Sequence, residues 1–221
     1  MPDSAGFCAP NAKTGKLEGI DVMIARRMAQ GIFGGTMFEV RPRVEFIEAS
    51  MSERLDMITQ GEADLVVAAL AATAERRKVA EFTGAYYGTA LTVAVRKDSK
   101  ISSVSDLKSS RVIVVDGSAD LEYAEKHGII GDIVLARSNA EMAKMLADGA
   151  ADAALSAAVH LDAYSDVWSE VASRMPIEFD SYQYAVGVRK GNDELCAFLD
   201  TQMNDVIRQG YVAIAAACAR R

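Results

Sequence analysis

Apolar runs bounded by turn residues alternate with amphipathic stretches along most of the chain. This alternation is typical of βαβ units and predicts an α/β fold with a mainly parallel sheet. Helices are predicted over Ile20–Gln30, Ser52–Gln60, Asp120–His127, Ala140–Asp148 and Asn192–Gln209, and a glycine directly follows the second, third and fourth. Strands are predicted over Val44–Ile47, Asp64–Leu70, Leu91–Val95, Arg111–Val115, Ile133–Ala136, Asp152–Ser156 and Tyr184–Arg189.

One spacing occurs twice along the chain. Met57, Gly61 and Asp64 have the same separations as Met145, Gly149 and Asp152. In both places a predicted helix ends at the glycine, and a predicted strand starts at the aspartate. Three matches of common turn chemistry also arise by chance, but the repeated spacing favours two similar lobes.

Composition restricts the class of protein. The 221 residues are 50% hydrophobic and 25% charged, with only 4 Pro, which is the balance of a folded globular chain. The apolar run Leu65–Ala72 is too short to span a membrane, and Met1–Gly6 lacks the basic start and apolar middle of a signal peptide. The net charge of −7 disfavours binding to nucleic acid.

The sequence predicts neither a metal site nor another cofactor. Cys8, Cys196 and Cys218 lie far apart, and His127 and His160 are the only histidines. No spacing typical of zinc or iron–sulfur ligands is present. Cys196 and Cys218 could approach each other if the C-terminal helices fold back, but free buried cysteine is the common alternative.

A series of motifs resembles one protein family over roughly residues 6 to 215. Gly-Lys-Leu-Glu-Gly-Ile-Asp-Val at 15–22 is similar to the start of the first helix in family 3 solute-binding proteins, the polar amino-acid receptors of ATP-driven importers. The same order of family motifs continues through Gly61–Leu65, Thr73–Arg76, Phe82 with Tyr86 and Tyr87, Val95–Lys97, Leu107 with Lys108, Gly117 with Ser118, and Tyr184–Gly191. The segment 12–16 and Arg54 look most like the glutamate and glutamine branch.

The resemblance implies a type 2 periplasmic-binding-protein fold, in which two α/β lobes are joined by two crossing strands and close on a ligand like a hinge. Lobe 1 would comprise residues 1–88 and 184–221, and lobe 2 residues 89–183. It also implies a non-enzymatic receptor, periplasmic or attached to the cell surface, that delivers an amino acid or related carboxylate to the permease of an ABC importer.

Arg76 is the leading candidate for ligand binding. If Thr73 caps a short helix, Arg76 lies in its first turn, where the helix dipole disfavours a cation and something must compensate it. For the neighbouring Arg77 and Lys78, ion pairs with Glu75 and Glu81 at the surface suffice to compensate the positive charge. For Arg76, the resemblance implies a two-pronged contact with the ligand's carboxylate.

The turn Asp116–Ser118 is the second candidate. It ends a predicted strand and opens a helix, so its amides could form an anion cradle, with Gly117 permitting close approach. The resemblance makes Ser118 a carboxylate contact, whereas the alternative is that Asp116 or Ser118 only caps the helix. Phe7 lies where the family places an aromatic residue against the ligand, although a lone aromatic is more often part of a core.

Several positions depart from the family pattern. Ala69 and Ala71 lie where the family has a glycine and a hydroxyl residue that contact the ligand, so their backbone groups remain as candidates while one hydroxyl is lost. Ala119 replaces a threonine, and Ala157 replaces the aspartate that normally neutralises the α-ammonium group. Because a buried ammonium needs a partner, these positions leave open a family member that no longer binds amino acids and acts as a partner-binding or structural module.

Two further alternatives concern the site and the start of the chain. A cyclohexadienyl-dehydratase-like enzyme would share the fold, but Asp116 is the only acid that maps to the cleft. No strand is predicted before Phe7, where the family has the first strand of lobe 1. If Met1 is the true start of the folded chain, we expect Val44–Ile47 and Asp64–Leu70 to pair directly or to borrow a segment from a second copy, which would make a homodimer.

Overall fold

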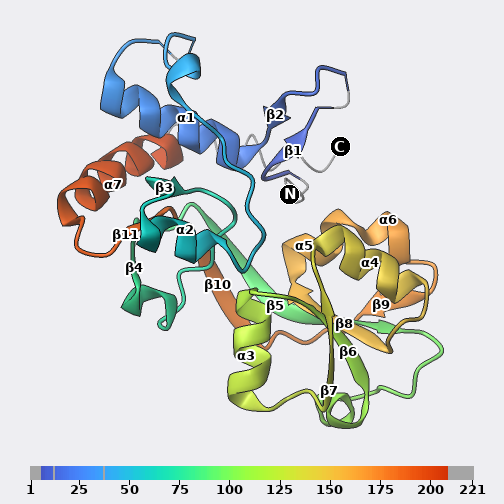
Figure 1. The fold of residues 1–221 in the computed structure, drawn as a ribbon. Helices are drawn as coiled ribbons and strands as arrows, with labels where there is room; N and C mark the ends of the chain where they lie inside the picture. Colours follow the sequence, from blue (N-terminus) through green and yellow to red (C-terminus); the bar gives the residue numbers. More distant parts are fainter. Residues whose placement is uncertain (1–5, 12, 37, 209–221) are drawn as a thin grey trace. The chain divides into compact units, whose positions relative to one another are not determined.

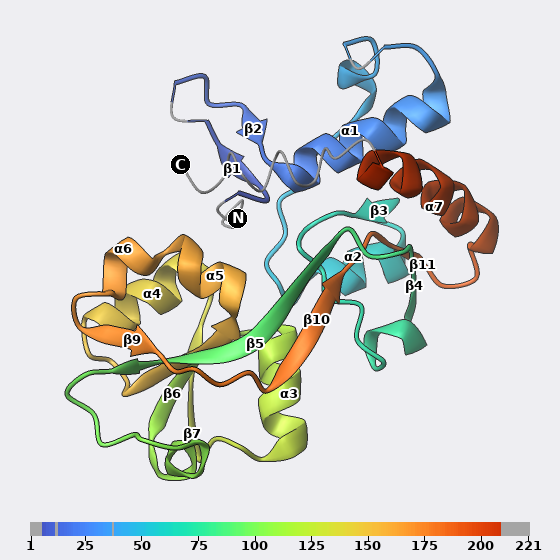
Figure 2. The same cartoon turned by 180° about the vertical axis from the view of Figure 1, so that it is seen from behind.

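The computed structural model describes residues 6–11, 13–36 and 38–208, and these form two compact units. The central unit comprises residues 50–53 and 89–182, and the terminal unit comprises the described residues of 6–49, 54–88 and 183–208. Besides the short segment 50–53, the chain passes between the units within β5 (Tyr87–Arg96) and between Tyr182 and Gln183 in β10 (Asp180–Tyr184). These two neighbouring strands run side by side (Figure 2). Helices alternate with strands, which confirms the predicted α/β class.

The central unit is built on a mixed sheet in the order β10-β5-β8-β6-β7, with β9 also paired to β5. The pairs β6–β7 and β6–β8 are parallel, whereas β5 is antiparallel to β8 and β9. The strands not yet located are β6 (Arg111–Val115), β7 (Asp132–Ala136), β8 (Ala153–Ala157) and β9 (Ala172–Arg174). Val112–Val115 and all of β8 are buried, as expected for apolar strands covered on both faces.

Helices cover both faces of this sheet. Figure 1 shows α4 (Asn139–Ala147), α5 (Ala158–Ala163) and α6 (Ser165–Trp168) together on one side and α3 (Ala119–His127) on the other. A short 3-10 helix, η3 (Val104–Ser109), precedes β6. The core under α4 contains Ile113, Val115, Met142, Leu146 and Trp168.

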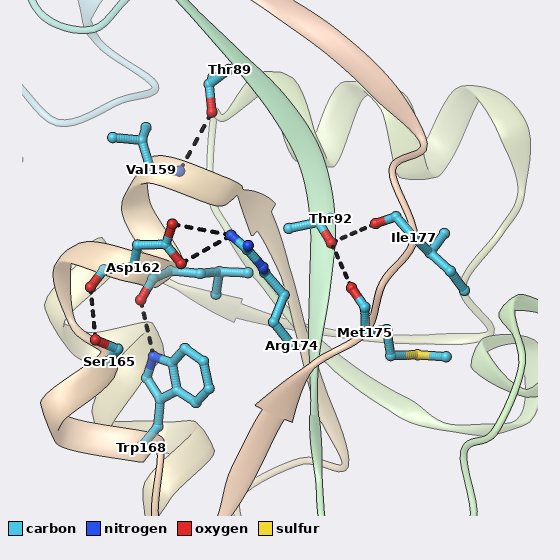
Figure 3. A network of polar contacts seen from close by, with 10 residues as sticks. Thr89, Thr92, Val159, Asp162, Ser165, Trp168, Arg174, Met175 and Ile177 are labelled. Carbon is cyan, nitrogen blue, oxygen red and sulfur yellow. Dashed lines mark hydrogen bonds and ion pairs between the residues drawn. The ribbon is translucent and has the colours of Figure 1, made fainter.

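The sequence predicted no helix at α5 and α6. Two side-chain contacts fix this segment (Figure 3): Trp168 donates from Nε1 to the Leu161 carbonyl at 3.2 Å, and Arg174 donates from Nη1 to both carboxylate oxygens of Asp162 at 2.9 and 3.0 Å. Both helices are short, at 6 and 4 residues, and therefore carry little of the periodic pattern that predicts helices.

The terminal unit contains two small sheets and three α-helices among its described residues. The helices are α1 (Ile20–Phe33), α2 (Arg54–Gln60) and α7 (Asp193–Arg208), and α1 and α7 lie side by side (Figure 1). The strands β1 (Ala9–Pro10) and β2 (Leu17–Glu18) form an antiparallel pair, and β3 (Leu65–Val66), β11 (Gly187–Arg189) and β4 (Ala80–Phe82) form a second sheet in that order. Two 3-10 helices, η1 (Arg41–Arg43) and η2 (Arg76–Lys78), complete it.

The predicted strand Val44–Ile47 is wrong, and so is its direct pairing with the next strand. Residues 44–50 follow η1 without entering a ladder, and Phe46 and Ile47 remain exposed. β3 pairs with β11 instead, so the apolar composition of residues 44–47 was not sufficient to place this segment beside a strand. Exchange of a segment between two copies stays a prediction, which light scattering can check.

Two other predicted strands are interrupted. Within the expected strand Asp64–Leu70, only Leu65–Val66 pairs, because Ala69 takes a left-handed conformation with φ 47° that cannot continue a strand. The expected strand Tyr184–Arg189 breaks at Ala185 and Val186, since the chain there leaves β5 to pair with β3 and β4.

The repeated spacing forms the same helix ending twice. Gly61 and Gly149 have φ values of 80° and 76°. In each case the amide five residues after the methionine donates to its carbonyl, Glu62 N to Met57 O at 2.8 Å and Ala150 N to Met145 O at 2.9 Å. This is the bonding of a helix closed by a left-handed glycine, and it occurs once in each unit.

Candidate functional site

The loop Ala68–Ala72 in the terminal unit holds two predicted ligand-binding positions, Ala69 and Ala71. Both are buried, and Ala69 is the only non-glycine residue with a positive φ among the residues described. An alanine in this conformation is unfavourable by roughly 1–2 kcal/mol, so surrounding contacts must hold it.

Hydrogen bonds fix the backbone of this loop along its whole length. Five hydrogen bonds, each given from donor to acceptor, involve the loop backbone: Arg54 Nη1 to Ala68 O at 2.8 Å, Ala69 N to Tyr86 Oη at 3.0 Å, Ala185 N to Leu70 O at 3.0 Å, Arg76 Nη1 to Ala71 O at 3.5 Å, and Ala72 N to Gln183 O at 2.9 Å. The loop is thus set by residues from four other parts of the same unit.

Arg76 lies at the start of η2 and is only 6% exposed. Thr73 Oγ1 accepts a hydrogen bond from the Arg76 amide at 3.2 Å, as the predicted cap would, although the N-cap residue of η2 itself is Glu75. The guanidinium reaches back to the Ala71 carbonyl. The structure therefore brings Arg76, Ala69 and Ala71 together, with a buried cation directly beside the fixed loop.

The cations that follow Arg76 are on the surface. Lys78 forms an ion pair with Glu75, as expected, but Glu81 pairs with Lys190 at 2.8 Å rather than with Arg77. The Arg77 guanidinium instead lies over the Phe82 ring, 5.3 Å from its centroid. A ring face attracts a cation, so Arg77 is accounted for by packing on the surface.

Phe7 belongs to a buried aromatic cluster. Its ring is edge-on to Tyr87 at 5.1 Å and to Tyr184 at 5.7 Å between centroids, and those two tyrosines are stacked at 6.1 Å. Because the residue is only 2% exposed, Phe7 is a core residue of the terminal unit, as expected for a lone aromatic.

Sequence reasoning missed a buried polar chain beneath the loop. Tyr86 donates its hydroxyl to Asp21 Oδ1 at 2.6 Å while accepting from the Ala69 amide. Burial raises the pKa of Asp21 from 3.8 to about 6, although Tyr86 and Arg54 act in the opposite direction. Asp21 was visible only as part of the Gly15–Val22 motif, and its placement on an otherwise apolar helix face was the available signal.

Asp21 makes the stability of the protein depend on pH. Since its folded-state pKa of about 6 exceeds the ordinary value of 3.8, the native state binds more protons between these values, and the free energy of unfolding falls as pH rises through the window. We expect wild type to lose about 1 kcal/mol more than Asp21→Asn between about pH 5 and about pH 7. Urea unfolding at both pH values measures this, and an equal loss in the two proteins would contradict it.

The turn Asp116–Ser118 lies in the central unit between β6 and α3. Asp116 N donates to Ala136 O at 2.9 Å and Ser118 N donates to Val115 O at 3.2 Å, so these two amides are not donors of an anion cradle. Gly117 has φ 67°, and a Cβ there would collide with the backbone of Ser52. Asp116 is exposed, whereas Ser118 is 5% exposed.

Ser118 is the N-cap of α3. Its Oγ accepts from Leu121 N at 3.1 Å, as the capping interpretation predicted. The hydroxyl proton is a separate donor, so capping and a contact to a ligand carboxylate are chemically compatible.

We expect Ser118→Ala to lower the free energy of unfolding by about 1 kcal/mol through loss of the cap. Ser138→Ala, which removes the equivalent cap of α4, is the matched control. Thermal unfolding of the two variants should show similar losses, and an unchanged melting temperature for Ser118→Ala would contradict the capping role.

A buried carboxylate that the sequence analysis did not single out lies in the same unit. Asp120, in the first turn of α3, accepts from Ser156 Oγ at 3.0 Å, and both residues are buried. Ser156 directly precedes Ala157, which is 1% exposed. Although position 157 lacks the family's aspartate, the carboxylate of Asp120 is hydrogen-bonded to the adjacent residue, Ser156.

Within 6–11, 13–36 and 38–208, no group of three or more His, Cys, Asp or Glu side chains could hold a metal ion. Cys8 and Cys196 are free thiols, and Cys218 lies outside these ranges. No helix in the same part of the chain is long and apolar enough to cross a membrane.

Comparison with other sequences places the chain in a family. The sequence model of the bacterial extracellular solute-binding proteins, family 3, matches residues 2–216. A glutamine-binding protein of Geobacillus stearothermophilus is 34% identical over 54% of this chain and 44% of its own length. The ABC transporter glutamine-binding protein GlnH of Bacillus subtilis is 30% identical over 66% of this chain and 52% of its own. The chain thus spans about half the length of these two relatives.

Solved structures share the fold. An amino acid ABC transporter substrate-binding protein of Streptococcus pneumoniae, bound to L-arginine, superposes with a TM-score of 0.86 at 23% identity, over 99% of this chain and 91% of that one. The solute receptor for L-cysteine of Neisseria gonorrhoeae gives 0.84 at 23% identity, over 98% and 86%. These likenesses confirm the predicted periplasmic-binding-protein fold, and with the matched family model they show that the chain belongs to the bacterial extracellular solute-binding proteins, family 3.

Proposed function

We propose that the protein is a non-catalytic receptor that captures a small carboxylate-bearing solute, an amino acid or a related compound. It delivers this solute to the permease of an ABC importer from the periplasm or the cell surface. The names of the relatives, which bind glutamine or serve amino acid ABC transporters, support this kind of ligand and partner.

Buried Arg76 is the observation that carries the proposal. A guanidinium with 6% exposure is costly to desolvate, and it lies beside a loop whose backbone is already fixed. A planar fork of N–H donors matches the geometry of a carboxylate, so Arg76 would form the anion contact. The hydroxyl of Ser118 would add a second donor from the central unit.

Recognition of an α-ammonium group would need an acidic side chain other than the one the family has at position 157. Ala157 cannot supply a carboxylate, and Ala71 and Ala119 supply no hydroxyl. Asp120, held against Ser156, is the buried acid that would take the role in the central unit. A site lacking any such partner would favour carboxylates without an amino group.

A thermal-shift panel on the full chain tests the proposal. The panel comprises the twenty L-amino acids, glutarate and 2-oxoglutarate, with glucose as a negative control. A ligand present at about one hundred times its Kd stabilises the native state by about 2.7 kcal/mol, which raises the melting temperature by several degrees.

Each outcome separates the candidates. Shifts with amino acids support the receptor, and shifts only with glutarate or 2-oxoglutarate support a carboxylate receptor without ammonium recognition. No shift with any compound, confirmed by isothermal titration calorimetry, would overturn the proposal and favour the partner-binding alternative suggested by Ala71, Ala119 and Ala157. Turnover of a panel compound would favour the enzyme.

A further inference from the structure

One residue of the loop Ala68–Ala72 has a strained backbone conformation. Ala69 has φ 47°, a conformation that a Cβ makes unfavourable, and no other non-glycine residue described has a positive φ. A loop in such a conformation persists only where its surroundings hold it. The contact that acts on Ala69 itself is the bond from its amide to Tyr86 Oη at 3.0 Å.

The Tyr86 hydroxyl has a fixed direction. It donates its single proton to Asp21 Oδ1 at 2.6 Å, and its oxygen is therefore available to accept from the Ala69 amide. Tyr86 is 5% exposed and Asp21 is 2% exposed, so water does not compete for either group. Ala69, Tyr86 and Asp21 form one chain of hydrogen bonds.

The far end of this chain is anchored in α1. Asp21 lies in the first turn of the helix, where the dipole favours a carboxylate, and its Oδ2 has no hydrogen-bond partner among the described residues. The charge that acts on Asp21 is that of the Arg54 guanidinium. Burial, together with the charge of Asp21, raises the pKa of the Cys8 thiol to about 11. Arg54 in turn donates to Ala68 O, the residue next to Ala69.

We propose that Tyr86 and Asp21 are positioning residues for ligand binding: Tyr86 holds Ala69 in its left-handed conformation, and Asp21 orients Tyr86. Together they fix the loop Ala68–Ala72, in which the Ala71 carbonyl accepts a hydrogen bond from the Arg76 guanidinium. The expected change in ligand affinity rests on the proposed function. The statement that Tyr86 holds Ala69 does not depend on it.

Two measurements on Tyr86→Phe test the inference. The variant keeps the ring and loses the hydroxyl, so amide hydrogen exchange at Ala69 should become faster. Affinity for the bound members of a probe set, L-glutamine, L-arginine, L-cysteine and glutarate, should fall about tenfold by isothermal titration calorimetry. Tyr123→Phe, which removes a hydroxyl bonded to Phe179 O at 3.1 Å in the central unit, is the control and should change neither quantity.

Rescue distinguishes positioning from a general loss of packing. Glycine adopts a positive φ without penalty, so the double variant Tyr86→Phe with Ala69→Gly should regain most of the affinity that Tyr86→Phe loses. Unchanged exchange at Ala69 in Tyr86→Phe, or a loss of affinity that Ala69→Gly does not reduce, would overturn the inference. If no compound of the full thermal-shift panel binds wild type, the proposed function fails, while the exchange measurement still decides whether Tyr86 holds the loop.

Discussion

Arg76→Lys is expected to lose about 100-fold in ligand affinity while the protein stays folded, since a charged hydrogen bond of about 1.5–3 kcal/mol is removed and each 1.4 kcal/mol is about tenfold. The lysine ammonium is a point charge that cannot reproduce a planar two-pronged contact. Arg76 sits at the start of a 3-10 helix, so its replacement leaves the cores of both units intact.

Isothermal titration calorimetry with the panel compound that gives the largest thermal shift measures this loss. Arg77→Lys is the matched control, because Arg77 is the next residue, exposed and stacked on Phe82. We expect it to bind as wild type does. Equal affinities for Arg76→Lys and wild type would remove Arg76 from the site.

Gly19→Ala is expected to lower the free energy of unfolding by roughly 3–5 kcal/mol, because backbone strain and a steric collision add. Gly19 precedes α1 with φ 130° and ψ 179°, a region that only glycine occupies. A Cβ there would collide with the Phe7 carbonyl, which accepts from the Asp21 amide at 2.9 Å. The start of α1 would have to move away from the segment that carries Phe7.

Gly15→Ala separates strain from collision. Gly15 also has a positive φ, 66°, but no atom lies within 4 Å of a Cβ built there. Its replacement should therefore cost only about 1 kcal/mol. Urea denaturation of both variants gives the comparison, and similar losses for the two glycines would show that the close approach at Gly19 is not what matters.

Some elements were predictable because their signals are local. The strand Arg111–Val115 contains the continuous apolar run Val112–Val115 and has the predicted bounds. Gly61, Gly128 and Gly149 end three helices as expected, since a left-handed residue after a helix is set by a few neighbouring bonds. The hydrogen bond from the Arg76 amide to Thr73 Oγ1 is equally local.

Other parts depended on distant partners. Val44–Ile47 has the composition of a strand, but a strand also needs a neighbour with free backbone groups, and no pattern within the segment reveals one. The amides of Asp116 and Ser118 had the spacing of an anion cradle, yet Ala136 and Val115 accept from them.

For this protein, the sequence by itself determined the α/β class and the family, because motifs and helix endings are encoded over a few consecutive positions. It also predicts Arg76 as the leading binding residue. Only the tertiary structure decided how the loop beside Arg76 is held. Asp21 and Tyr86 are 65 residues apart and meet only after α1 and the segment ahead of β5 have packed into one unit. A hydrogen bond across such a separation follows from packing, and no local preference specifies it.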